Sequence, residues 1–521
     1  MRRTFIKIIV NCIIFCIPVC IIKANVAIDT VRVHYEQVEH NLLSKNWNSD
    51  VYSSPGVKSY QYAQKLSSLG VNYLDRDEKI AYMSQKGDRL NSWQIVANSY
   101  LPFKKSNVLW GTAYYRQDYI KNITYCSTAD FDMLYPHIIA DLYLHNSFTE
   151  EYSFSGGYAK KHNRWSWGLF SYFRALDEYR RKDPRAFNVV SELEIASGAS
   201  YKVKEKYSVF CGAAVKRYKQ SSSVRSFASA IKRKQFFMLG PSSYYAMFST
   251  ENILALYQGY TFGVNAGMVS HTGVGPELFL SYKRMNFDRA DSKVNLTPVT
   301  SMIEDNSRSV LTWKGKFGNF TYGAKFLGEY IHRTGIEYLL GSVVYGVYPV
   351  KASFEQYYST RLNLISSLLF EYNLENNFTI GLSPYGGIRN YDEKCLLPSQ
   401  EQKIHTVNVG GNFILQKTFG KRNLLVLSFR GDFIKVIDKK QYLTDGKLII
   451  KELNMNYERG KIMEKNFRIM TTDYFMYDAG LKYSFAFSDN LSLYISAHYA
   501  QRAFAVPKKN HCIEVSSGIL F

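Results

Sequence analysis

Apolar and polar residues alternate along many segments of this chain. In FTYGAKFLGEY (320–330), Phe326 and Tyr330 fall on one face, and Lys325 and Glu329 fall on the other. The same period of two recurs in the segments WSWGLFSYF (165–173), LLVLSFRGDF (424–433), LSLYISAHY (491–499) and HCIEVSSGILF (511–521). Successive side chains of a β-strand point to opposite faces, so this period predicts an all-β protein.

The connections between these segments alternate in length. Short polar turns are predicted at 101–107, 161–164, 204–206, 271–275, 316–319, 374–377, 420–423 and 488–490. Between them lie mostly longer connections, at 118–149, 220–252, 287–307, 334–355, 392–403 and 437–466, with two short exceptions near 179–186 and 505–510. Tight turns at one end and larger loops at the other are typical of a transmembrane antiparallel up-and-down β-barrel. We therefore predict a barrel of about 18 strands, within a range of 14–18, over residues 66–521.

The N-terminus has the pattern of a secretory signal peptide. Arg2, Arg3 and Lys7 precede an apolar run at 8–22, and Ala24 provides a small residue for cleavage. The run is too short and too interrupted for a transmembrane helix, which needs roughly 20 apolar residues. We expect residues 1–24 to be removed on export.

Residues 25–65 are predicted to form a short N-terminal leader or plug. Residues 28–60 lack strong alternation, and VRVHYEQVEHNLLSKNW (31–47) is compatible with a short helix. A segment that plugs one mouth of the barrel and a disordered leader both fit this pattern.

Four charged residues fall on the polar faces of predicted strands and are candidate lumen-facing charges. They are Lys325, Glu329, Arg430 and Asp432. A wet lumen tolerates such side chains in the middle of a strand, whereas lipid does not. They would either tune the selectivity of an open pore or form a salt-bridge network that closes the lumen.

Composition and charge fit a membrane barrel better than a nucleic-acid-binding protein. Aromatic residues make up 16% of the chain, and 42 of them are tyrosines. Tyrosine has an apolar ring and a polar hydroxyl, so it suits the boundary between lipid and water. The net charge of +21 is spread along the sequence, which suits contact with anionic lipid headgroups. An exported chain also has little access to nucleic acid. Cys126, Cys211, Cys395 and Cys512 follow the signal; they allow three disulfide pairings or free thiols.

No catalytic, cofactor-binding or metal-binding residues are predicted. The ten histidines form no HExxH pair, and no GxSxG motif occurs. His498, on a polar face beside Tyr494, has the most site-like position of the ten. HTGVG (271–275) is interpreted as a hairpin turn, and the glycines of SGGY (155–158) as a bulge or a close packing site.

The C-terminus resembles the last strand of outer-membrane barrels, which ends on an aromatic residue. Ile513, Val515, Ile519 and Phe521 match this pattern, and the resemblance implies recognition by the barrel-assembly machinery. Three further stretches resemble an uncharacterised Bacteroidota outer-membrane β-barrel family known only as a domain of unknown function: LYPHIIAD (134–141), EYSFSGGYA (151–159) and YRRKDPRAFNVVSELEIASGASY (179–201). This resemblance implies a fold and a location, the bacterial outer membrane, but no activity.

The sequence thus favours a non-enzymatic barrel that passes small solutes, including hydrophobic ones, through the outer membrane. Its expected partners are outer-membrane lipid, the assembly machinery and a small-molecule solute. The alternative is a closed structural barrel whose loops at 220–252 and 437–466 bind a partner. A barrel hydrolase is a third hypothesis, because the barrel fold alone does not determine function.

Overall fold

The computed structural model describes residues 32–104, 106–141, 143–227, 235–241, 244–250, 252–374, 378–443, 455–505 and 509–521. The predicted signal peptide lies outside the described residues. No helix within the described ranges is both long and apolar enough to cross a membrane.

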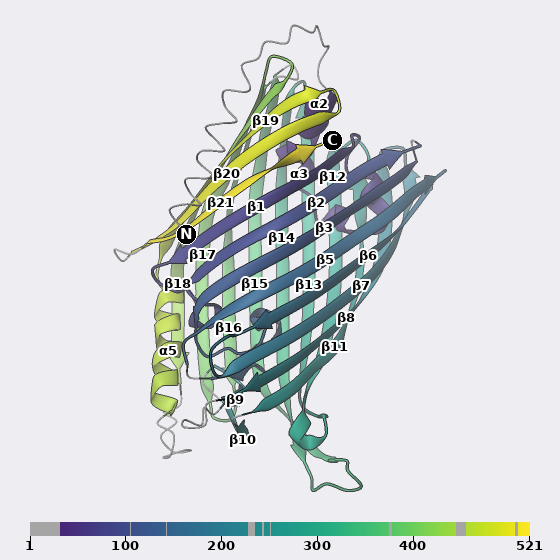
Figure 1. Cartoon of the computed structure of the whole chain (residues 1–521). Helices are drawn as coiled ribbons and strands as arrows, with labels where there is room; N and C mark the ends of the chain where they lie inside the picture. Colours follow the sequence, from purple (N-terminus) through teal and green to yellow (C-terminus); the bar gives the residue numbers. More distant parts are fainter. Residues whose placement is uncertain are drawn as a thin grey trace.

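Eighteen antiparallel strands form one closed barrel, which confirms the predicted fold and strand number (Figure 1). In order, they are β1 (Leu66–Glu78), β2 (Arg89–Phe103), β3 (Asn107–Ile123), β5 (His145–His162), β6 (Trp165–Tyr179), β7 (Arg185–Lys204), β8 (Tyr207–Arg225), β11 (Ile253–Ser270), β12 (Gly275–Asp291), β13 (Thr297–Phe317), β14 (Phe320–Leu340), β15 (Val350–Leu374), β16 (Phe378–Cys395), β17 (Gln400–Phe419), β18 (Asn423–Tyr442), β19 (Tyr474–Ser488), β20 (Leu491–Phe504) and β21 (Lys509–Leu520). The last strand, β21, pairs with β1 and closes the sheet.

Shorter elements lie inside the barrel or at its ends. They are α2 (Arg32–Asn41), α3 (Leu43–Asn46), α4 (Phe131–Leu134), α5 (Met455–Met470), the 3₁₀ helices η1 (Val51–Ser53), η2 (Pro55–Tyr60), η3 (Ser84–Lys86) and η4 (Ser292–Val294), and a small sheet of β4 (Ile139–Ala140), β9 (Gln235–Met238) and β10 (Tyr244–Thr250). Helix α2 lies within the stretch for which the sequence suggested a helix.

The tight turns within the described residues lie at one end of the barrel, which we call the turn end. Most of the turn predicted at 374–377 lies outside the described residues. Asn163, Gly273, Gly318 and Gly420 adopt positive φ angles of 54°, 69°, 56° and 57° in these turns. Glycine and asparagine adopt such angles at low cost, which is why polar glycine-containing segments mark hairpins in the sequence. The opposite end, with the longer connections, is the loop end.

Several strands extend farther toward the loop end than the sequence suggested. The predicted connections at 287–307 and 334–355 are too long, because β12 continues to Asp291 and β14 continues to Leu340. The apolar alternation fades in these extensions because their outer faces lie beyond the apolar band. The predicted ends of these strands therefore correspond to the edge of the apolar band, and the strands themselves continue beyond it.

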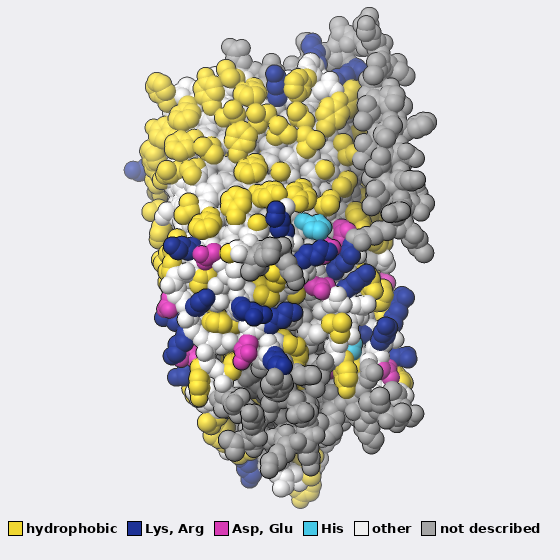
Figure 2. All heavy atoms as spheres, turned by 90° about the vertical axis from the view of Figure 1, so that its left-hand side faces the viewer, with side chains coloured by type: hydrophobic (Ala, Val, Ile, Leu, Met, Phe, Trp, Pro, Cys, Tyr) yellow, Lys and Arg dark blue, Asp and Glu magenta, His cyan; other side chains and the backbone are white. Residues whose placement is uncertain are grey.

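On the face shown in Figure 2, a band of apolar and aromatic side chains covers the outside of the barrel near the turn end. On β14, Phe326 and Tyr330 are 46% and 47% exposed, whereas Leu327 between them faces inward and is 8% exposed. About ten residues of a tilted strand span roughly 25 Å, which matches the apolar band of a membrane barrel. Charged side chains become frequent on the outer surface below this band in Figure 2.

The glycine pair of SGGY does not form a bulge, because β5 keeps a continuous register with both neighbours through Gly156 and Gly157. A Cβ atom on Gly157 would lie 2.2 Å from the ring of Trp110. The close-packing interpretation is therefore correct, and the space left by the missing side chain is filled by an indole ring on β3.

Candidate functional site

The N-terminal segment, residues 32–60, lies inside the turn end of the barrel, and we call it the plug segment. Helix α2 contacts β1 and β20, α3 contacts β15, η1 contacts β11 and β12, and η2 contacts β3 and β5 to β8. These strands come from all parts of the wall. The plug segment therefore crosses the turn-end mouth and is held from many sides.

Much of the contact between the plug segment and the wall is polar. The amide of Asn48 donates to Glu277 on β12 at 2.5 Å, and the hydroxyl of Ser44 donates to Glu371 on β15 at 2.6 Å. The indole N–H of Trp47 donates to a serine on β16 at 3.1 Å. These are hydrogen bonds between side chains that water can replace when the segment moves.

An apolar contact accompanies these hydrogen bonds. Val51 and Val57 are fully buried in a cluster with Phe210, Phe279 and Val310, which point inward from β8, β12 and β13. Burial of two valine side chains contributes about 3–6 kcal/mol before the cost of ordering the segment. Docking of the plug segment thus combines a small apolar anchor with a set of polar contacts.

Two of the four predicted lumen charges belong to a network around the plug segment, one by direct contact and one through an arginine. Lys325 on β14 donates to the carbonyl of Trp47 at 2.7 Å and lies 3.7 Å from the carboxylate of Asp50. Arg308 on β13 bridges Asp50 at 2.8 Å and Glu329 at 3.3 Å. The predicted Lys325 and Glu329 therefore belong to one network, whose centre is an aspartate of the plug segment.

The other two predicted charges form a separate network. Arg430 and Asp432, both on β18, pair at 2.8 Å, and both contact the hydroxyl of Tyr385 on β16. The structure does not bring this pair together with Lys325 and Glu329. Alternation placed these charges on polar faces, but Asp50 and Tyr385 could not be inferred as partners because they are distant in sequence from the charges that they contact.

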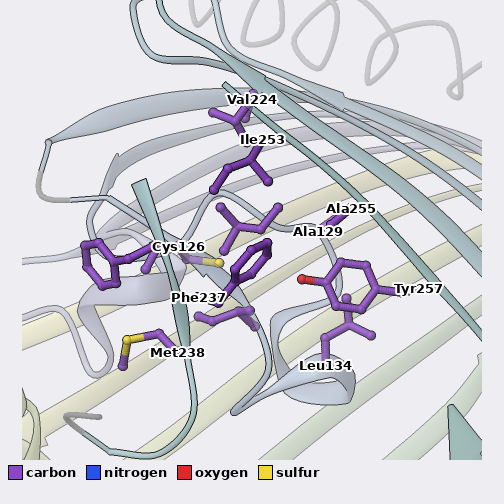
Figure 3. Packing of buried hydrophobic residues seen from close by; sticks show 14 of the residues in the cluster. Cys126, Ala129, Leu134, Val224, Phe237, Met238, Ile253, Ala255 and Tyr257 are labelled. Atoms are coloured by element: carbon purple, nitrogen blue, oxygen red, sulfur yellow. The ribbon is translucent and has the colours of Figure 1, made fainter. Parts of the chain in front are cut away.

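The loop end contains a second inward-folded region, residues 124–141, between β3 and β5. Leu134, Ile139, Phe237 and Tyr257 are fully buried in an apolar cluster that also includes residues of β7, β8, β12 and β13 (Figure 3). In Figure 3, Phe237 of β9 lies among Cys126, Ala129 and Tyr257. We call residues 124–141 with β9 the outer closure.

A buried ion network fixes the outer closure to the wall. Asp141 accepts hydrogen bonds from Arg180 at 2.9 Å and from Ser127 at 2.6 Å, and its other oxygen lies 2.8 Å from a ring nitrogen of His145. Burial alone would raise the pKa of Asp141, but the hydrogen bond from His145 and the charge of Arg180 outweigh it and lower this pKa to about 2. Nearby, Arg174 on β6 binds Asp130 at 2.5 Å.

Two cavities lie on the inner side of the barrel wall. One, of about 340 Å³, is lined by Asp132, Met133, Glu194, Ala214, Lys216, Thr261, Gly263, Lys283, Met285, Glu304, Asn306 and Arg333. The other, of about 400 Å³, is lined by Leu66, Ser68, Asn72, Val96, Asn98, Asp478, Lys482, Tyr494, Ser496, His498, Glu514, Ser516 and Leu520. Both linings carry charges of both signs.

His498, which the sequence singled out, lines the larger cavity. Its Nδ1 atom lies 3.5 Å from Asp478, and Glu514 is its cross-strand neighbour on β21. Within the described residues, no group of three or more histidine, cysteine, aspartate or glutamate side chains is arranged to hold a metal ion. Sequence reasoning missed Lys482 and Asp478 because nothing local distinguishes them from other polar-face residues.

The terminal strand forms the seam of the barrel. Ile513 and Phe521 are 42% and 45% exposed on the outer surface, and Val515 and Ile519 share that face and are partly exposed. The backbone N–H and C=O of Phe521 both bond to Ser67 at 2.9 Å. The terminus is therefore tied into the sheet, while recognition by the assembly machinery stays a prediction.

The four cysteines that the sequence left open, Cys126, Cys211, Cys395 and Cys512, form no disulfide bond. Cys126 and Cys395 are buried, and Cys211 is exposed on the outer face of β8. Burial raises the pKa of Cys126, which lies in the outer closure, to about 12. None of the three possible pairings is used.

The model of a family of unknown function, DUF6850, matches residues 55–521. No curated protein matches the sequence. The structure is similar to BauA, the ferric preacinetobactin receptor from Acinetobacter baumannii, with 9% identity, a TM-score of 0.42 and coverage of 88% of this chain and 80% of that chain. It is also similar to the siderophore receptor PiuA from the same species, with 7% identity, a TM-score of 0.42 and coverage of 88% and 82%. The structure is similar as well to the copper transporter OprC, with 8% identity, a TM-score of 0.39 and coverage of 87% of this chain and 80% of that chain.

Proposed function

This chain belongs to the family of unknown function DUF6850, and we propose that it is a gated β-barrel that passes small polar solutes across a bacterial outer membrane. The apolar outer band, the tight turns at one end and the long connections at the other support this location. The turn end then faces the periplasm and the loop end faces the outside. Export by the N-terminal signal peptide is part of the proposal.

The observation that carries the proposal is the way the plug segment is docked. Its contacts to Glu277, Glu371, Arg308 and Lys325 are polar, so water can solvate both sides when the segment leaves. A permanent stopper would be expected to bury mainly apolar surface. The lining of both cavities is rich in charged groups, which favours polar solutes over the hydrophobic ones considered from the sequence.

Conductance in planar bilayers tests this function. Four proteins are compared: the full chain, a deletion of residues 32–60, a replacement of residues 125–142 by a short Gly/Ser linker, and the combination. We expect rare, small openings for the full chain and the largest conductance for the combination, because both closures are then absent. Heat-dependent migration in SDS gels verifies that each variant still forms a barrel.

Two outcomes would contradict gated passage. If the combined variant folds as a barrel and conducts at no voltage, the lumen is closed by the wall itself and the proposal is wrong. If the full chain already conducts as well as the combined variant, the barrel is an open pore and the plug segment is no gate.

Asp50 provides a single-residue version of this test. Asp50→Asn removes the carboxylate that Arg308 and Lys325 share, so that Arg308 is left with Glu329 and Lys325 loses its ion pair with the plug segment. We expect the open probability of the channel to rise severalfold. Asp305→Asn, on the outer face of β13, removes a similar ion pair with Arg284 and is the matched control. Equal effects of the two substitutions would contradict a role for Asp50 in gating.

A closed interaction barrel is the second candidate, and the outer closure is the observation that favours it. The loops at 220–252 and 437–466 contribute Phe237 and Met463 to the apolar cluster, so these parts of the loops pack inward. Residues 228–234 and 444–454 of these loops lie outside the described residues. If the full chain binds a partner protein through these loops and the combined variant does not conduct, this second function is favoured.

A further inference from the structure

The larger cavity lies at the seam of the barrel, where the first two strands meet the last three. Its walls come from β1, β2, β19, β20 and β21. On the turn side, Leu66 and Tyr494 pack against Val33 of α2, together with Leu520. Helix α2 of the plug segment therefore packs against the turn side of this seam cavity.

Two opposite charges in the seam cavity do not neutralise each other. Lys482 on β19 lies over the ring of Tyr494, with its Nζ atom 4.6 Å from the ring centroid. Across the described parts of the chain, neither Lys482 nor Glu514 is within ion-pair distance of an opposite charge. Both side chains are partly buried, so each lacks the full hydration that would otherwise stabilise its charge.

The strand register separates these two charges. Lys482 is paired with Ser496 on β20, and Glu514 on β21 is paired with His498. They are thus two strands and two residues apart, about 12 Å between backbones. Asp478 and His498 lie toward the Glu514 side, so one region of the cavity is acidic and another carries the ammonium group of Lys482.

Neutral hydrogen-bonding groups occupy the wall between these regions. Asn72 and Asn98 point in from β1 and β2, and Ser496 and Ser516 hydrogen-bond each other at 2.5 Å. A cavity of about 400 Å³ is within the range of small-molecule sites, about 300–1,000 Å³. Its shape and polar groups suit a solute that is charged at both ends.

The smaller cavity differs because most of its charges are already paired. Lys216 binds Glu192 at 2.9 Å, and Arg333 binds Glu304 at 2.5 Å. A solute would have to break these pairs to use the same groups. The seam cavity offers Lys482 and Glu514 without that cost.

We propose that the seam cavity binds a small zwitterion of about dipeptide size, with its ammonium group toward Glu514 and Asp478 and its carboxylate toward Lys482. The inference rests on the proposed function, because it names the class of polar solute that the gated barrel takes. Each end of the solute gains a charge-assisted hydrogen bond.

Equilibrium binding to the full chain in detergent, measured by titration calorimetry, tests the site. The ligands are alanyl-alanine, its N-acetyl derivative and its C-terminal amide, which differ only in which end is charged. We expect alanyl-alanine to bind about tenfold or more tightly than either derivative, because each derivative loses one charged contact. Equal binding of the three ligands, or no binding of any, would overturn the proposal without reference to any variant.

Substitutions locate the two ends of the ligand. Lys482→Met should weaken the binding of alanyl-alanine about tenfold to a hundredfold and leave the binding of the amide derivative nearly unchanged. Glu514→Gln should weaken the binding of alanyl-alanine to a similar extent and leave the binding of the N-acetyl derivative nearly unchanged. Lys283→Met, which changes a lysine of the smaller cavity, is the matched control. Affinity loss with Lys283→Met equal to that with Lys482→Met would refute the assignment.

The outcome is distinguishable from that of the conductance test. A barrel that conducts without binding the zwitterion disproves the seam site alone. A barrel that binds the zwitterion but does not conduct disproves gated passage alone.

Discussion

At the scale of single residues, glycines on the lumen side set how closely the plug segment approaches the wall. A Cβ atom on Gly168 of β6 would lie 2.3 Å from the carbonyl oxygen of Pro55, and one on Gly198 of β7 would lie 2.9 Å from the backbone nitrogen of Gly56. Backbone atoms cannot rotate away as a side chain can. These wall positions therefore require the absence of a side chain while the plug segment is docked.

Gly168→Ala tests this contact. We expect the added methyl group to displace η2 and to increase protease cleavage within residues 32–60 severalfold, while the barrel itself stays folded. Gly156→Ala on β5 is the control, because its nearest neighbour, the carbonyl oxygen of Trp110, would be 3.9 Å from the new atom. Unchanged cleavage in the Gly168 variant would show that the docked position is not maintained in solution.

At the scale of elements, α2 links docking of the plug segment to pH. Burial lowers the pKa of His34 to about 4, and burial also lowers the pKa of His40. An undocked histidine has a pKa near 6.5, so between about pH 6.5 and 4 the undocked segment binds a proton that the docked one does not. Docking therefore weakens as the pH falls through this range. Glu36, whose pKa is raised by burial, has the opposite effect between its ordinary pKa of 4.5 and its raised value, so it partly offsets the histidines within the same pH range.

We expect cleavage of the plug segment to be on the order of tenfold faster at pH 5 than at pH 7.5. The rate is normalised to the isolated peptide of residues 32–60 digested at the same pH. His34→Gln, which keeps a donor near Ser492, should remove most of this difference, whereas His162→Gln at an exposed site should retain it. A pH dependence that survives His34→Gln unchanged would assign it to another group.

At the scale of the whole molecule, the barrel depends on one long-range pairing. Strand β21 joins β1 over eleven residue pairs, from Ser68 with Leu520 to Glu78 with Asn510. Gly518 lies opposite Gly70, and a Cβ atom on Gly518 would lie 2.2 Å from the carbonyl oxygen of Leu69. The seam is therefore sensitive to side chains that point into the lumen at this position.

Gly518→Val should prevent closure of the seam, because the valine side chain meets backbone atoms of β1. The expected result is loss of the fast-migrating folded form in unheated SDS gels. Ser517→Val places the same side chain on the exposed outer face, where it contacts lipid, and should leave this form unchanged. Closure that tolerates both substitutions equally would contradict the tight seam.

The sequence by itself determined the barrel, the strand number and the positions of the tight turns, because period two and turn-forming residues are local properties. Alternation also placed Lys325, Glu329, Arg430 and Asp432 on polar faces. Only the tertiary structure decided what those charges contact and how the lumen is closed. Asp50 lies 258 residues from Arg308, and the seam cavity joins residues from both ends of the chain, so their meeting depends on closure of the sheet and on the path of the plug segment.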